Sequence, residues 1–358
     1  DKSNEIIPDI QSLFADLQRV EVIIKTKPQG WEFEEIANLA VNETHESGSC
    51  LIIVNTKQNA RAIFEILTGK TEYPVYHLST NICPAHRIGK LQEIRNKLGK
   101  SPLICVSTQL IEAGVDVDFG SVIRSVAGLD SIAQAAGRCN RNGRRTAGKV
   151  FVINPAKESI RSLQDIKIGK EITERIFYQY SLTPNELQCN ILNPNWMKQY
   201  YKYYFFQRAN EMSYPVNVGR DDNLFELLST NEKSISEYVR INENDPGIYF
   251  CQSFAKAAEV FKAIEAPTQG ILVPYGNAGK ELITDFFSQY AIERRFELLR
   301  KAQRFSVNVF PNILERLKKL GALHTVDDLN VLILNEQYYH QDFGLSLECV
   351  NEMEILNR

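Results

Sequence analysis

The first 155 residues alternate short apolar runs with helical patterns, and this alternation constrains the fold more than any other feature of the sequence. The runs are continuous and rich in Val, Ile and Leu, as in strands that are buried on both faces. Helical segments between successive strands favour parallel pairing, with helices on both faces of the sheet. The sequence therefore predicts an α/β fold with a parallel sheet, whose strands lie at residues 51–54, 75–78, 103–106, 121–126 and 149–153.

Helix boundaries in this part follow from capping and periodicity. Apolar residues recur at helical spacing over residues 59–68, which Gly69 closes. Pro84 suits the first turn of a second helix that ends at Gly99. A third helix is expected from about residue 131 to 142, capped by Asp130 or Ser131.

The rhythm changes after residue 156, so we expect three domains. Residues 1–156 form the α/β domain, 157–245 a helical connector, and 246–358 a small α+β domain. In the last domain we expect strands at 271–274, 306–309 and 330–334 and helices at about 278–303 and 311–320. Seven aromatic residues gather at 196–206; they suit either base stacking or an inter-domain core, and the core is the commoner use.

Composition excludes several classes of protein. The net charge of −3 gives no overall attraction to nucleic acid or lipid, so any such contact needs a local patch. The 7 cysteines are scattered and form no C-x-x-C pair, which favours reduced thiols in a cytoplasmic protein. Cys83 and His86 lack a second pair of metal ligands, so no metal site is expected. No apolar run approaches the ~18 residues of a membrane span.

Residues 134–144 carry the first chemical signal. On one continuous helix, Gln134, Arg138 and Arg141 would share a face at i, i+4 and i+7. Guanidinium groups stay charged and match the geometry of phosphate, so such a face suits a transferring γ-phosphoryl group. A solvated basic helix end is the alternative that this segment alone leaves open.

Residues 106–119 carry the second signal, directly after a predicted strand. Ser107 and Thr108 stand where amides and hydroxyls can hold a phosphate oxygen. Gly114 permits close approach of the backbone, and Asp116 can accept from a ribose hydroxyl or orient an arginine. Taken alone, Thr108 is as readily a helix cap and Asp116 a turn residue.

Together the two segments resemble motifs V and VI of superfamily-two helicases, and residues 51–60 resemble motif IV. The resemblance implies a second RecA-like domain. Such helicases trap Mg-ATP between two RecA-like domains, of which the second supplies arginine fingers. It implies catalytic roles for Gln134, Arg138 and Arg141, which would bind the nucleotide together with Gly114 and Asp116. It also implies that single-stranded nucleic acid contacts Asn55, Thr56, Ser107 and Thr108.

Finer features resemble the CRISPR-associated helicase–nuclease of type I systems. Motif VI begins with Gln134, where DEAD-box RNA helicases usually have His, and residues 76–80 and 83–87 are similar to that family. Residues 303–309, 338–339 and 344–345 are similar to its C-terminal signature, and 196–215 resembles subtype I-C. The family implies translocation on single-stranded DNA, degradation of invading DNA and recruitment by an RNA-guided surveillance complex.

The sequence contains no complete phosphate loop. Gly69-Lys70-Thr71 resembles the end of one, but Phe64 occupies the position of its first glycine. It also contains neither a D-E-x-H motif nor an H-D pair. We therefore expect an HD nuclease domain and a first RecA-like domain elsewhere in a parent protein, and an inactive fragment without them. A DEAD-box-like RNA helicase and a non-catalytic binding module remain alternatives.

Overall fold

A computed structural model of the chain describes residues 7, 9–182, 190–244, 247, 250–262, 267–288, 292–326 and 329–349. Cys189 and residues 1–4 lie outside this part. Contacts divide the chain into one unit of Asp1–Tyr200 with Thr268–Arg358, and a second unit of Tyr201–Pro267. The domain boundaries expected at residues 156 and 245 remain a prediction.

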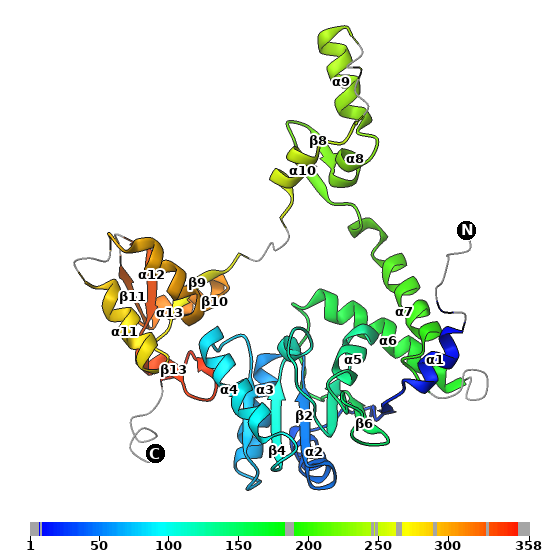
Figure 1. Cartoon of the computed structure of the whole chain (residues 1–358), viewed down its shortest axis with the longest axis vertical. Coiled ribbons are helices and arrows are strands. Elements are labelled where there is room, and N and C mark those ends of the chain that lie inside the picture. The colour runs from blue at the N-terminus through cyan, green and yellow to red at the C-terminus, as the bar shows by residue number, and fades with distance from the viewer. Residues whose placement is uncertain are drawn as a thin grey trace. The chain divides into compact units, whose positions relative to one another are not determined.

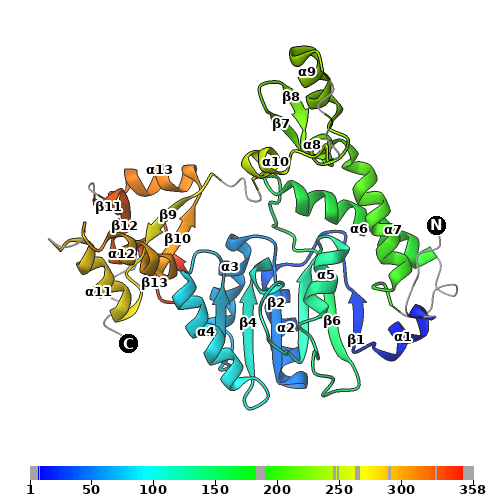
Figure 2. The same ribbon diagram turned by 45° about the horizontal axis from the view of Figure 1, so that its top comes forward.

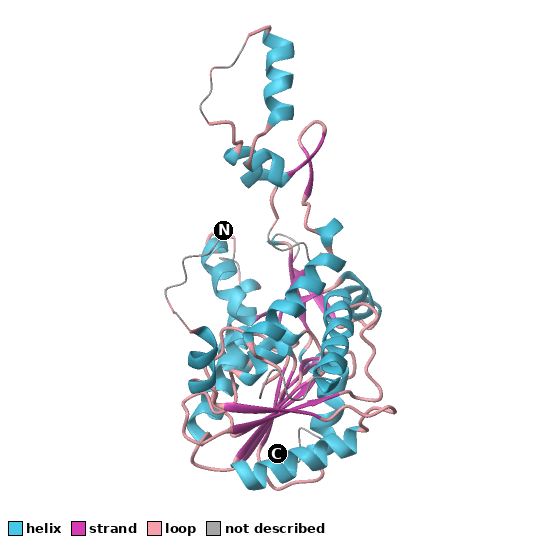
Figure 3. Cartoon of the chain, turned by 90° about the vertical axis from the view of Figure 1, so that its right-hand side faces the viewer, coloured by secondary structure: helices cyan, strands magenta, loops and turns pink. Residues whose placement is uncertain are grey.

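The first unit is built around a six-stranded sheet with the order β1-β6-β5-β2-β4-β3, in which every neighbouring pair is parallel. Figure 1 labels β2, β4 and β6 of this sheet, and Figure 3 shows helices on both sides of the strands. The predicted α/β fold is confirmed. The strands are β1 (Val20–Ile24), β2 (Ser49–Ile53), β3 (Val75–Leu78), β4 (Leu103–Ser107), β5 (Ser121–Ser125) and β6 (Gly148–Ile153).

The helices cover the sheet as right-handed crossovers require. Helices α2 and α3 pack on one face, over a core that includes Ile52, Ile104 and Ile123. Helices α4 and α5 contact β3 and β5 on the other face (Figure 2). Their bounds are α1 (Ile10–Asp16), α2 (Phe33–Ser47), α3 (Lys57–Thr68), α4 (Pro84–Lys97) and α5 (Leu129–Ala136).

The five predicted strands and the helices beginning near residues 59 and 84 are present. Thr56 caps α3 by accepting from the Asn59 amide at 3.2 Å, and Pro84 occupies the first turn of α4. The sequence analysis missed β1 and α2. The Val20–Ile24 run of β1 is rich in β-branched residues, which could have revealed it.

The C-terminal part of this unit contains a four-stranded sheet with the order β10-β9-β12-β11. Strands β9 and β12 are parallel, whereas the outer two pairs are antiparallel. The predicted helix over 278–303 is interrupted: α11 ends at Phe286 and α12 begins at Arg295. The elements are β9 (Gln269–Leu272), α11 (Gly276–Phe286), α12 (Arg295–Ala302), β10 (Ser306–Val309), α13 (Pro311–Lys319), β11 (Leu323–Val326), β12 (Val331–Leu334), β13 (Tyr339–His340) and β14 (Gly344–Leu345).

This C-terminal sheet packs against the start of α4. The His86 ring stacks on Tyr275 at 4.2 Å, and its Nδ1 lies 3.0 Å from the Tyr339 hydroxyl. The Tyr339 hydroxyl also accepts from the Cys83 amide at 3.2 Å. Burial lowers the pKa of His86 to about 3, so this imidazole is neutral at physiological pH. The two family-like segments at 83–87 and 338–345 therefore form one interface.

Beyond the main sheet, the chain continues into α6 (Gln164–Leu182) and α7 (Pro194–Gln207). The Tyr200 hydroxyl donates to the Asp130 carboxylate at 2.9 Å, which ties α7 to the start of α5. Trp196 and Tyr200 are buried, whereas Phe205 and Phe206 are exposed. The first members of the aromatic cluster thus contribute to the core, and its last two members are exposed.

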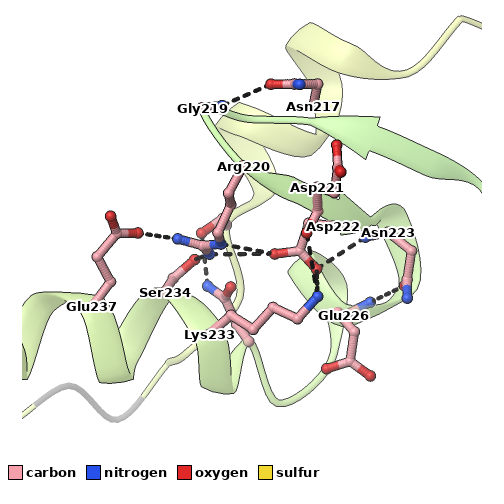
Figure 4. A network of polar contacts seen from close by, with 12 residues as sticks. Asn217, Gly219, Arg220, Asp221, Asp222, Asn223, Glu226, Lys233, Ser234 and Glu237 are labelled. Atoms are coloured by element: carbon pink, nitrogen blue, oxygen red, sulfur yellow. Dashed lines mark hydrogen bonds and ion pairs between the residues drawn. The ribbon is translucent and has the colours of Figure 1, made fainter.

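Among its described residues, the second unit contains the end of α7, a β-hairpin and three further α-helices, so the predicted helical connector also includes strands. Its organising group is the buried Asp222 carboxylate, which pairs with Arg220 and Lys233 at 3.3 Å each (Figure 4). Arg220 also contacts Ser234 and Glu237 of one helix. The elements are β7 (Pro215–Asn217), β8 (Asp221–Asn223), α8 (Leu224–Leu228), α9 (Glu232–Asn242) and α10 (Phe254–Val260).

We predict that Gly344→Ala detaches the C-terminal segment from the α/β domain. Gly344 has a φ of 73°, and an added Cβ would lie 2.2 Å from the Asn81 carbonyl oxygen. Gly321 has a φ of 63° but open space around its Cβ, so Gly321→Ala costs only the ~1–2 kcal/mol of the left-handed conformation. Gly344→Ala should lower the melting temperature further and speed hydrogen exchange at 339–347. Equal effects of the two variants would contradict this docking.

Candidate nucleotide and nucleic-acid site

The candidate strand-binding residues lie at the carboxyl edge of the main sheet. Because β2 and β4 are adjacent and parallel, with Ile53 opposite Ser107, their last residues end at the same edge. Thr108 follows β4, and its amide donates to the Leu78 carbonyl at the end of β3 at 3.2 Å. The sequence therefore brings Asn55, Thr56, Ser107 and Thr108 to one edge, as expected for a shared contact surface.

These four residues differ in their access to a ligand. Thr56 is half-buried at the start of α3, and Thr108 is 9% exposed. Ser107 is fully buried, and its hydroxyl donates to the Thr108 carbonyl at 2.9 Å. Asn55 is buried, and its amide contacts Val126, Arg124 and Glu158. Asn55 and Ser107 are thus engaged within the domain, and Thr56 is the most exposed of the four.

A cleft of about 370 Å³ lies beside this edge, between the main sheet and the C-terminal sheet. Lys57 and Arg61 of α3 line one side, and Arg316 of α13 lines the other. The Lys57 ammonium donates to the Asn81 side chain at 2.6 Å, after β3. The sequence analysis did not single out these three cations, although Lys57 directly follows the motif IV pair.

The motif V turn leads from the carboxyl edge towards the second part of the site. It contains a short 3-10 helix at Gln109–Ile111, followed by Gly114 with a φ of 69°. Nothing lies within 4 Å of the position that a Gly114 Cβ would occupy, so the glycine serves the backbone conformation and leaves the turn open. Asp116, with its side chain 79% exposed, follows on the surface.

The helix that carries Gln134 ends earlier than predicted. Helix α5 stops at Ala136, so the expected helix to residue 142 and the shared i, i+4, i+7 face are wrong. After Gly137 the backbone pairs with Phe119: the Phe119 amide donates to the Arg138 carbonyl, and the Asn140 amide donates to the Phe119 carbonyl, each at 2.9 Å. These long-range bonds replace the helical ones. Gln134 is exposed on the helix, whereas both arginines lie in the following loop.

The loop holds the two arginines differently. The Arg138 guanidinium donates to the Ile111 and Glu112 carbonyls of the motif V turn, at 3.1 and 2.5 Å. The Arg141 guanidinium is half-exposed and lies 3.3 Å from the Asp116 carboxylate. Asp118 accepts from the Arg141 amide at 2.7 Å and so fixes the loop. One guanidinium is therefore anchored while the other is presented to solvent.

Electrostatics favours an anion beside these two groups. Burial lowers the pKa of Arg138, and the positive charge of Arg141 lowers it further. Two guanidinium groups that repel each other gain from a phosphate between them, and their planar donors match its oxygens. The structure thus places the Arg138 guanidinium on the motif V turn and the Arg141 guanidinium beside Asp116 of the same segment.

A buried ion pair was missed by the sequence analysis. Arg124 of β5 is fully buried, and its Nε lies 2.8 Å from a carboxylate oxygen of Glu112. Burial raises the pKa of Glu112, and the Arg124 charge opposes that shift. An arginine in the middle of an apolar strand was the available signal, since charged residues are rarely buried unless paired.

In the part of the chain that the structure describes, no group of three or more His, Cys, Asp and Glu side chains is arranged to hold a metal ion. Within the same residues, no helix has both the length and the apolar character to cross a bilayer.

Residues 46–144 match the family model described as CRISPR-associated nuclease/helicase Cas3, C-terminal. The CRISPR-associated nuclease/helicase Cas3 of Haloferax volcanii is 52% identical over 66 residues, which are 17% of this chain and 7% of that protein. The Streptococcus thermophilus protein of the same name is 25% identical over 145 residues, or 38% of this chain and 15% of that protein.

Structural comparison extends the match across most of the chain. The T. fusca Cas3–ADP structure superimposes with a TM-score of 0.52 at 14% identity, covering 88% of this chain and 39% of that one. The T. fusca Cas3–ATP structure gives a TM-score of 0.51 at 12% identity with the same coverage. At this identity the likeness concerns the fold. The chain spans well under half the length of these relatives.

The six-stranded parallel sheet with helices on both faces is a RecA-like fold, which the chain shares with the T. fusca Cas3 structures. Over residues 46–144 the sequence is similar to the C-terminal part of CRISPR-associated Cas3 nuclease/helicases.

We predict that Arg138→Ala destabilises this chain and Arg141→Ala does not. Removing the Arg138 guanidinium leaves two carbonyls of the motif V turn without their donor, a loss of about 1–3 kcal/mol. Arg141 makes an exposed ion pair, which contributes about 0–1 kcal/mol. Urea unfolding of both variants measures the difference. Equal stability of the two variants would show that Arg138 does not anchor the turn.

Proposed function

We propose that this chain is the second half of the motor of an ATP-dependent single-stranded-DNA translocase and nuclease, which degrades invading DNA in type I CRISPR interference. The observation that carries the proposal is the pair of arginines: Arg138 is fixed on the motif V turn, while Arg141 faces solvent beside Asp116. A half-site of this kind needs a second surface to close over the phosphates.

Mg-ATP is the nucleotide that this half-site suits. The first RecA-like domain of the parent would supply the phosphate loop and the metal-binding acids, and the bound nucleotide supplies the γ-phosphoryl group. In this chain, Arg141 orients its guanidinium donors towards that group, and Asp116 holds the guanidinium in place beforehand. Gln134, exposed on α5, would contact the nucleotide from the same side.

Single-stranded DNA would cross the carboxyl edge of the sheet. The Thr56 and Thr108 hydroxyls suit backbone phosphates, and the cleft beside them adds the positive charges of Lys57 and Arg316, whereas Arg61 is paired with Glu65 and Glu348. Phosphate contacts of this kind fix the position of a strand without reading its sequence, as a translocase requires. Recruitment by an RNA-guided surveillance complex follows from the family resemblance.

The nucleotide half of the proposal predicts a large effect of Arg141→Ala on turnover in the full-length protein. Arginine fingers contribute ~10³–10⁵ in rate in GTPases. Turnover should therefore fall far more than ATP or DNA binding, and Arg141→Lys should restore little because an ammonium lacks the planar donors. Arg144→Ala is the matched control, since Arg144 is an exposed arginine of the same loop. Near-normal turnover in Arg141→Ala would reduce this segment to a solvated basic loop.

The strand half predicts that Thr108→Ala weakens binding of single-stranded DNA by ~1 kcal/mol, the contribution of one neutral hydrogen bond. Nucleotide affinity should stay unchanged. Fluorescence anisotropy with labelled DNA and RNA oligonucleotides, and a separate nucleotide titration, make the comparison. If Thr108→Ala weakens nucleotide binding alone, Thr108 does not contact the strand as proposed. If only RNA stimulates turnover, an RNA helicase is favoured.

The isolated chain should hydrolyse no ATP, because it lacks the phosphate loop and the metal-binding acids. A malachite-green phosphate assay on the purified chain measures this, with the full-length protein as the positive control. If the isolated chain does hydrolyse ATP and Arg141→Ala leaves the rate unaltered, its nucleotide site is different from the one proposed.

A further inference from the structure

A buried polar network connects the strand side and the nucleotide side of the domain. Its centre is the Arg124 guanidinium, which donates to the Asn55 side chain at 2.7 Å and pairs with Glu112 at 2.8 Å. Glu112 in turn accepts from the Ser131 hydroxyl of α5 at 3.1 Å. Asn55 also donates to Glu158 at 2.9 Å. The network therefore joins the ends of β2 and β5, the motif V turn and the first turn of α5.

The same network reaches the arginine beside the nucleotide site. Glu112 belongs to the motif V turn, and its own carbonyl oxygen accepts from Arg138. A shift of the Glu112 backbone would therefore move the anchor of Arg138. At the other end, Asn55 immediately precedes Thr56, so a shift of Asn55 would move a candidate strand contact. The path from Thr56 to Arg138 thus runs through directly bonded groups.

Stability alone does not account for such a pair. Burying an ion pair costs solvation free energy, and well-packed apolar residues in its place are often neutral or stabilising. The Arg124 and Glu112 side chains are 0% and 4% exposed, so they contact neither ligand directly. The Arg124 Nη2 has no hydrogen-bond partner among the described residues, so the pair does not use all of the hydrogen-bonding capacity of the guanidinium.

We propose that Glu112 and Arg124 are positioning residues that couple strand binding at the carboxyl edge to the placement of Arg138 at the nucleotide site. This inference rests on the proposed function. The pair makes ATP hydrolysis depend on whether single-stranded DNA is bound, and neither side chain contacts the DNA or the nucleotide.

The test compares ATP turnover of the full-length protein with and without saturating single-stranded DNA, for wild type, Glu112→Gln, Arg124→Met and the double variant. The ratio of stimulated to basal turnover should fall by roughly 5–150-fold, the usual range of a coupling between sites. DNA and ATP affinities, each measured alone, should change little. The double variant should lose no more than one single variant, because the two residues act through one contact.

Ile104→Ala is the matched control for stability. Ile104 is fully buried in β4, within the core on the α2–α3 face, and takes no part in the network. This variant should lower the melting temperature and preserve the ratio. A preserved ratio in Glu112→Gln and Arg124→Met, with lower melting temperatures, would overturn the inference. If both variants fail to fold, Ser131→Ala decides: it removes one bond to Glu112, and an unchanged ratio there would overturn the inference as well.

Failure of the proposed function is recognised separately. If wild-type turnover is absent or does not respond to DNA, the proposed function fails before any variant is compared. If wild-type turnover responds to DNA and the variants respond equally, only the coupling fails.

Discussion

Parallel pairing of β2 with β4 and β5 is the constraint on which the remaining structure depends. It aligns Ile53 with Ser107 and with Arg124, so that three chain segments leave the sheet at the same edge. The motif IV residues, the motif V turn and the start of α5 are distant in sequence and become neighbours only through this register. A one-residue slip of β5 would turn Arg124 to the opposite face, because side chains alternate along a strand.

The C-terminal sheet contributes to the site through its docking on α4 and β3. Tyr339, His86 and Tyr275 form an aromatic contact, and the Gly344 conformation lets the Leu345 amide reach the Asn81 carbonyl at 2.9 Å. Asn81 in turn accepts from Lys57 in the basic cleft. The docking therefore fixes a residue of the cleft as well as the two sheets. The contact between residues 83–87 and 338–345 therefore gives a physical reason for the presence of both family-like segments.

The sequence predicted the main sheet well because its signals are local. Continuous apolar runs marked five strands, and Pro84 marked the start of α4. The end of α5 could not be predicted in this way, since Gly137 permits either outcome and the deciding bonds go to Phe119, 18 residues earlier than Gly137. Arg138 and Arg141 were selected for their residue types, and the continuous helix expected to carry both of them is wrong. Their placement depends on the motif V turn, and hence on tertiary contacts.

The contacts of the buried network also depend on the tertiary structure and could not be predicted from the sequence. Asn55 was interpreted as a strand contact, yet its amide is used by Arg124, Glu158 and the Val126 carbonyl. Only the assembled sheet brings these groups together. Glu112 and Arg124 each lie within segments that the sequence analysis considered, but no periodicity connects them.

The most direct test of these site assignments is an experimental structure of the full-length protein with a non-hydrolysable ATP analogue and single-stranded DNA. The Arg141 guanidinium should lie within hydrogen-bond distance of the γ-phosphate, with Arg138 still on the motif V turn. The Thr108 hydroxyl should contact a backbone phosphate of the strand. A nucleotide bound elsewhere, with Arg141 still in solvent beside Asp116, would contradict these assignments.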